Sequence, residues 1–146
     1  MRYAFLRPIV LALALAMAAC GGDDSSTTSP TTATGPGSQL FEGQLQSRGD
    51  FQFFSFTVTA AGNVNVTLAS VTTTTSPGTS LNLALGVGLG TPLGTDCNLT
   101  QQTTTGPGLT PQLTGSNFSP AIYCVKVFDV GNLTVPVNFA VRIDHT

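Results

Sequence analysis

Few side chains in this 146-residue chain carry groups that could perform catalysis. The chain holds three cysteines, one histidine, seven aspartates and glutamates and five lysines and arginines. General acid–base catalysis uses groups whose pKa can be matched to proton transfer, most often histidine or paired carboxylates. The histidine, His145, is the penultimate residue, where chains fray, and no two carboxylates beyond residue 38 are neighbours in sequence. The sequence therefore predicts a protein that is not an enzyme.

Two carboxylates, Asp129 and Asp144, would meet only if the strands that carry them were adjacent. A cleft that gathered both with His145 would indicate a small hydrolase. The sequence favours solvated turn charges instead, because Asp129 is followed by the turn-forming residues Gly131 and Asn132.

The low charge excludes further classes of function. Charged residues make up 8% of the chain, against about 25% in typical soluble domains. Five basic residues, two of them within the first seven positions, cannot form a surface that tracks phosphates, so we expect no nucleic-acid partner. The acidic residues beyond residue 38 are scattered, and neither a metal nor another cofactor is predicted.

The first nineteen residues have the pattern of a secretory signal. Arg2 and Arg7 precede an apolar run over residues 9–19, which ends in small residues. A membrane-spanning helix needs about 20 apolar residues, and this run stops at Cys20. We therefore interpret residues 1–19 as a signal peptide and not as a membrane span.

The end of that run, Met17-Ala18-Ala19-Cys20, resembles the lipobox of bacterial lipoprotein precursors. In that family, two small residues precede a cysteine whose thiolate accepts a diacylglyceryl group and which becomes the new N-terminus. Met17 stands where the family prefers leucine, and the alternative is an ordinary signal peptide with an incidental cysteine. Because Gly21 and not aspartate follows Cys20, the resemblance implies lipid anchoring to the outer membrane of a Gram-negative cell.

Residues 20–38 form a stretch of Ser, Thr, Gly and Pro in which alanine is the only apolar side chain after Cys20. Such a stretch cannot bury enough surface to offset the ordering of its backbone. We expect a flexible tether between the lipidated Cys20 and a single folded domain over residues 39–146.

Two cysteines remain, Cys97 and Cys124. Export places them in an oxidising compartment, where a pair of cysteines is most simply a disulfide. A redox or metal pair is the competing interpretation, but the chain has no CxxC motif. We predict a structural disulfide.

The domain has no helical periodicity, whereas apolar and polar residues alternate between Gly, Pro and Asn. The alternation predicts an all-β, antiparallel β-sandwich of jelly-roll type with seven or eight short strands. The first two clear strands are expected to form a hairpin, and the glycines at 86, 88 and 90 to give a flat or bent strand and not a phosphate loop. The expected strands cover residues 51–59, 64–68, 81–89, 121–128 and 135–143, with weaker candidates at 40–45 and 97–100.

Several of these segments resemble the bacterial pre-peptidase C-terminal domain, namely 43–45, 50–58, 62–68 and 121–127. Domains of this family are β-sandwiches attached to secreted proteases and other exported hydrolases, where they assist secretion or contact with the substrate. No peptidase precedes the domain here, and Ala121 stands where relatives often have glycine. Some relatives bind Ca²⁺ through acidic clusters, which this domain lacks, so the resemblance implies the fold but not the metal.

Phe51 and Phe53 are the candidates for a partner-binding patch. Phe54, Phe56 and Val58 already occupy the opposite face of their strand. Either the strand is central and buried on both sides, which is the favoured interpretation, or an apolar patch is exposed for a partner. Stacking of sugars on exposed aromatic rings is not expected, because the chain has no Trp and Tyr123 is assigned to the core.

We therefore expect a lipoprotein of the cell envelope whose sandwich is a non-catalytic binding or structural module. Its partners would be the membrane, through the lipid on Cys20, and an envelope protein or polysaccharide. The alternative is an accessory domain that binds substrate for a separately encoded secreted hydrolase.

Overall fold

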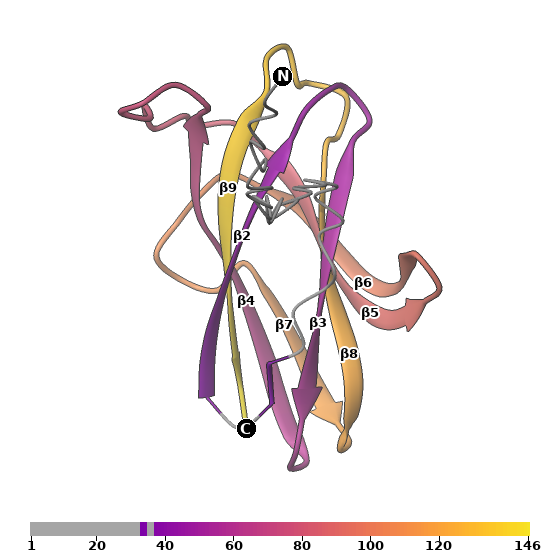
Figure 1. The fold of residues 1–146 in the computed structure, drawn as a ribbon. Helices are drawn as coiled ribbons and strands as arrows, with labels where there is room; N and C mark the ends of the chain where they lie inside the picture. Colours follow the sequence, from indigo (N-terminus) through magenta and orange to yellow (C-terminus); the bar gives the residue numbers. More distant parts are fainter. Residues whose placement is uncertain (1–32, 35–36) are drawn as a thin grey trace, which may run out of the picture.

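The computed structural model describes residues 33–34 and 37–146, and within them the chain is a two-layered sandwich of strands (Figure 1). The predicted signal peptide, Cys20 and most of the predicted tether lie outside the described residues. Within residues 33–34 and 37–146, no helix has the length and apolar character that crossing a membrane would need.

Alternating sequence produces nine strands in this part of the chain. They are β1 (Ala33–Thr34), β2 (Gly37–Leu45), β3 (Phe51–Val58), β4 (Gly62–Thr73), β5 (Leu85–Leu93), β6 (Asp96–Thr105), β7 (Leu113–Phe118), β8 (Ala121–Phe128) and β9 (Val137–His145). The all-β prediction is confirmed. Four residues of the predicted tether, 33–34 and 37–38, belong to strands β1 and β2.

The strands form two sheets. Sheet A has the order β1-β3-β8-β5-β6 and sheet B the order β2-β9-β4-β7. All neighbours are antiparallel except β1, which runs parallel to β3. The predicted antiparallel sandwich is therefore present, with one short parallel pair at an edge.

The core lies between the sheets and is built mainly from alternate residues of β2, β3, β4, β5, β8 and β9. In β3 the inward residues are Phe54, Phe56 and Val58, which are all buried. Phe54 stacks on Phe41 of β2 and meets the edge of Phe139 of β9, so aromatic rings join the two sheets.

The predicted hairpin of β3 and β4 is wrong, because β3 lies in sheet A and β4 in sheet B. Alternation shows which residues share a face but not which strand lies alongside, and the short connection after Val58 crosses between the sheets. The consecutive strands that do pair within the described residues are β5 and β6.

Several strands extend beyond their predicted bounds, most clearly β4 (predicted 64–68) and β6 (predicted 97–100), and two further differences concern β5 and β7. The strand expected from residue 81 begins at Leu85, although Leu81 and Leu83 still pack against the core. Strand β7 was not predicted, because Thr114, Gly115, Ser116 and Asn117 interrupt its apolar pattern.

Candidate functional site

The outer face of sheet A is the part of the molecule where the candidate residues gather. Glycines 86, 88 and 90 of β5 lie on this outer face. The residues that alternate with them, Leu85, Val87 and Leu89, are buried in the core. Neighbouring side chains lie over the space that these glycines leave. A Cβ atom at Gly86 would overlap the ring of Phe128, and one at Gly88 would lie 2.6 Å from Cδ1 of Leu99. The prediction that these glycines lie in a strand and not in a phosphate loop is confirmed.

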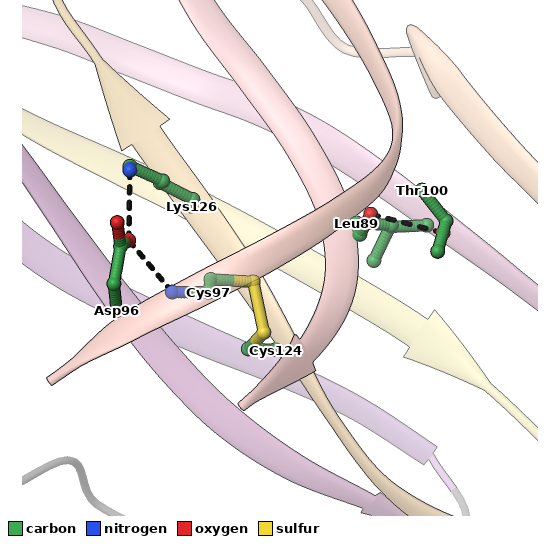
Figure 2. Close-up of a disulfide and its surroundings, with 6 residues drawn as sticks. All are labelled: Leu89, Asp96, Cys97, Thr100, Cys124 and Lys126. Carbon is green, nitrogen blue, oxygen red and sulfur yellow. Dashed lines mark hydrogen bonds and ion pairs between the residues drawn. A yellow bond between two sulfur atoms is a disulfide. The ribbon is translucent and has the colours of Figure 1, made fainter. Parts of the chain in front are cut away.

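Strand β6 bends over the end of β5. Leu89 pairs with Gln101 and Gly90 with Leu99, so Thr100 is the extra residue of a β-bulge. Its hydroxyl donates a hydrogen bond to the carbonyl oxygen of Leu89 at 3.2 Å (Figure 2). A Cβ atom at Gly90 would overlap the backbone carbonyl of Asn98, so this crossing requires glycine.

The bend brings the predicted cysteine pair together. Cys97 of β6 and Cys124 of β8 lie on opposite sides of β5, and strands separated by one other strand are normally about 9.5 Å apart. Their Cα atoms are only 5.9 Å apart and their sulfur atoms are bonded (Figure 2). The predicted disulfide is confirmed.

Lys126 lies at the centre of this face. Its ammonium group is 2.7 Å from a carboxylate oxygen of Asp96 and 3.8 Å from the centre of the Phe51 ring. Only 16% of the Lys126 side chain is exposed. The hydrogen bond from Lys126 and another from the backbone N–H of Cys97 hold the pKa of Asp96 below its ordinary value.

The two phenylalanines proposed as a patch lie on this outer face. Strand β3 lies between β8 and the two-residue strand β1. In its register with β8, Phe51 pairs with Phe128 and Phe53 with Lys126. Phe51 is 39% exposed and Phe53 is half-buried, so the favoured interpretation, a strand buried on both faces, is wrong for these two rings. With Leu99 and Phe128 they make up what we call the outer apolar layer. A hollow of about 230 Å³ opens beside it, and the residues that line it are Gly49, Phe51, Leu99, Gln102, Lys126, Phe128 and Asp129.

Asp129 has a structural position at the end of β8. Its carboxylate accepts hydrogen bonds from the backbone N–H groups of four residues at 2.9–3.1 Å, namely Gly49, Gly131, Asn132 and Leu133. Burial raises the pKa of Asp129, but these four donors outweigh it, and the pKa lies below its ordinary value. The carboxylate therefore organises a turn.

Asp144 and His145 are at the other end of the sandwich. Both lie at the end of β9, whose first residue, Val137, follows the Asp129 turn. The Asp144 carboxylate accepts a hydrogen bond from Arg142, and the buried His145 ring lies tilted against Phe56, with 5.6 Å between ring centres, and contacts Gln39. Eight residues of strand are about 25 Å long, so the cleft that would have indicated a hydrolase does not form.

Sequence reasoning missed the pairing of Lys126 with Asp96 and Phe51. The outward position of Lys126 could be read from its alternation with Val125 and Val127, but its partners come from two other strands and depend on the order within the sheet. Among residues 33–34 and 37–146, no three His, Cys, Asp or Glu side chains gather to hold a metal ion.

Neither a protein-family model nor a curated protein matches the chain. Similar solved structures include the pre-peptidase C-terminal domain of a collagenase from Bacillus anthracis, at 14% identity over 80% of this chain and 95% of that one, with a TM-score of 0.46. They also include PliG, a periplasmic inhibitor of g-type lysozyme, from Salmonella Typhimurium (14% identity, 80% and 98% covered, TM-score 0.47) and Aeromonas hydrophila (17% identity, 78% and 96% covered, TM-score 0.45). The first of these is a domain of the family that the sequence resembles.

Proposed function

We propose that the chain is a lipid-anchored, non-catalytic binding module of the bacterial cell envelope, which contacts a protein partner through the outer apolar layer of sheet A. The observation that carries the proposal is this layer itself. It places three phenylalanines and a leucine on an outer sheet face, where Phe51 remains 39% exposed. Aromatic residues are enriched in protein interfaces relative to the rest of the surface.

The surroundings of three carboxylates, those of Asp96, Asp129 and Asp144, favour binding over catalysis. Asp129 is held by four backbone donors, Asp96 by Lys126 and Asp144 by Arg142. A catalytic acid or base needs a lone pair or proton that the substrate can reach. These three carboxylates instead accept hydrogen bonds from backbone and side-chain groups that stabilise turns and strand contacts.

The pairing of the cysteines supports the anchor. Cys97 and Cys124 are bonded to each other, which leaves Cys20 as the remaining cysteine of the three. A cysteine left over in an exported protein suggests a reactive thiol or a bond outside the chain. The sequence before Cys20 resembles a lipobox, which accounts for this third cysteine by lipidation. Acyl chains contribute about 0.8 kcal/mol per buried CH₂ group, so more than one chain on Cys20 would hold the protein firmly at the membrane.

Membrane partition tests the anchor. We expect the full-length chain expressed in a Gram-negative bacterium to sediment with the outer membrane, and the Cys20→Ala variant to appear in the soluble fraction. The matched control is the Cys97→Ser/Cys124→Ser double variant, which keeps Cys20 and should remain with the membrane. A Cys20→Ala chain that stays in the membrane fraction would show that the anchor is wrong.

Crosslinking in the same cells tests the binding face. We expect a photoreactive amino acid at position 51 to give an adduct of discrete mass, whereas the same group at Thr114, on the outer face of sheet B, should not. An adduct of twice the chain's mass would identify a second copy as the protein partner. If both positions crosslink alike, or position 51 gives no adduct, the outer apolar layer is not the binding face.

A further inference from the structure

The outer face of sheet B carries a polar hollow that the proposed protein-binding face does not use. Three neighbouring strands contribute one residue each to two rows across it: Glu42, Ala140 and Ser70 in one row, and Gln44, Asn138 and Thr72 in the next. The small side chain of Ala140 lies between Glu42 and Ser70, at a hollow of about 560 Å³ that Gly43, Gln52 and Phe139 also line. This volume lies within the range of about 300–1,000 Å³ that is common for ligand sites.

A chain of amide groups fixes the direction of one side chain in the hollow. Gln46 donates through Nε2 to Oε1 of Gln44, and Gln44 donates through Nε2 to Oδ1 of Asn138 at 3.1 Å. An amide has two donor hydrogens on nitrogen and an acceptor oxygen. Since the oxygen of Asn138 is engaged by Gln44, its Nδ2 group is the part that is left to donate to a ligand. No hydrogen bond from Nδ2 is found within the described residues.

The remaining groups complement this donor. The ionised carboxylate of Glu42 can only accept hydrogen bonds, whereas the hydroxyls of Ser70 and Thr72 can both donate and accept. Adjacent hydroxyl groups of a sugar also donate and accept, and so can bridge the Glu42 carboxylate and the Asn138 amide. An apolar ligand would leave these polar groups without partners.

Charge narrows the class of ligand. Glu42 is the charged side chain among the residues that line the hollow. The nearby Arg142, which pairs with Leu40 and Thr67 in the next row, donates from Nε to Asp144 at 3.0 Å. An anionic ligand would therefore meet the Glu42 carboxylate, and the charge of the nearby Arg142 already has a carboxylate partner. We propose that this hollow binds a neutral saccharide through hydrogen bonds, without aromatic stacking.

The expected affinity is low, because single hydrogen bonds exchanged with water contribute little net free energy. We expect dissociation constants in the millimolar range for short oligosaccharides. Attachment to a membrane would allow such a site to act on a polymer with many repeats, since linked weak contacts add through effective concentration.

Nuclear magnetic resonance titration tests the proposal on the chain carrying Cys20→Ser, which is expected in the soluble fraction. The probes are maltotriose, cellotriose and mannotriose at millimolar concentration, with trigalacturonic acid as the anionic comparison. We expect at least one neutral trisaccharide to shift the amide signals of Glu42, Ser70 and Asn138, and the anionic one to shift them less. The proposal is overturned if no neutral trisaccharide shifts them, or if trigalacturonic acid binds equally well.

Two variants separate binding from folding. Asn138→Ala removes the fixed donor and should weaken the binding about tenfold, the equivalent of one well-made hydrogen bond. The matched control is Asn65→Ala, an amide of the same face that bonds to Thr114 outside the hollow, and it should bind as the unaltered chain does. Thr72→Val serves as a second lining variant if Asn138→Ala fails to fold. Equal affinity of the lining and control variants would contradict the proposal and leave the protein-binding face on sheet A untouched.

Discussion

At the scale of the residue, Asp129 shows how a carboxylate can have a purely structural role. The sequence marks it as a turn residue, and the structure shows the reason: four backbone N–H groups converge on its two oxygens. That convergence could not be predicted, because one donor, Gly49, lies 80 positions away in the chain. A local turn can be predicted from the residues beside it, whereas a hydrogen-bond donor that is distant in the chain can be identified only from the fold.

Replacing Asp129 by asparagine should destabilise the domain. The asparagine amide keeps one oxygen but places an NH₂ group against backbone donors, and an unsatisfied buried donor costs about 1–3 kcal/mol. Urea unfolding at neutral pH measures the loss. Asn132→Ala is a control, because its own side chain contacts the carbonyl oxygen of Ala84 and not the Asp129 carboxylate.

The same carboxylate predicts a loss of stability in acid. Its pKa in the folded state lies below the ordinary value of 3.8, so the unfolded chain takes up its proton first as the pH falls. The stabilisation is therefore complete above the unfolded pKa and is lost as the pH falls through the folded pKa. We expect Asp129→Asn to reduce the stability difference between pH 6 and pH 2. An unchanged difference would show that other carboxylates dominate.

At the scale of the element, strand β5 shows what the sequence could and could not reveal. Alternation correctly placed Leu85, Val87 and Leu89 on one face and glycines on the other. It could not reveal that Phe128 and Leu99 lie over two of these glycines, because those residues belong to β8 and β6. The order of strands in a sandwich depends on contacts that are distant in the chain, and the wrong β3–β4 hairpin has the same cause.

The glycines of β5 should differ in their tolerance of alanine. At Gly88 the new methyl group meets the flexible end of the Leu99 side chain, whereas at Gly90 it meets the backbone of Asn98. Overpacking typically costs about 1–3 kcal/mol, and we expect Gly88→Ala within this range and Gly90→Ala above it. Thermal unfolding of the two variants measures the order. Equal losses would mean that β6 can move away from β5.

The two candidate binding surfaces differ in how far they can be predicted from single strands. Phe51 and Phe53 could be named from one strand alone, but the polar hollow of sheet B needs β2, β9 and β4 side by side. Its residues are common surface types that no local motif distinguishes. Sites assembled from one residue per strand are therefore the ones that sequence reasoning misses.

At the scale of the whole molecule, the disulfide connects β6 to β8 and closes a loop within the second half of the chain. Cys97 and Cys124 are 27 positions apart, and closing a loop of this length is worth about 3.5 kcal/mol in the chain-entropy model. We expect the Cys97→Ser/Cys124→Ser double variant to lose about this much stability, measured by urea unfolding. Reduction of the unaltered chain should give the same loss, and a loss near zero by both routes would contradict the prediction.

The position of β2 has a mechanical consequence. The chain enters sheet B at Gly37, which pairs with His145, and all nine residues of β2 pair with β9. A pull on the N-terminal side, directed along the strand, would slide β2 against β9 and strain all nine residue pairs together, whereas a pull across the strand would open them one after another. The domain would therefore resist a load on its N-terminal side best when that load runs along β2.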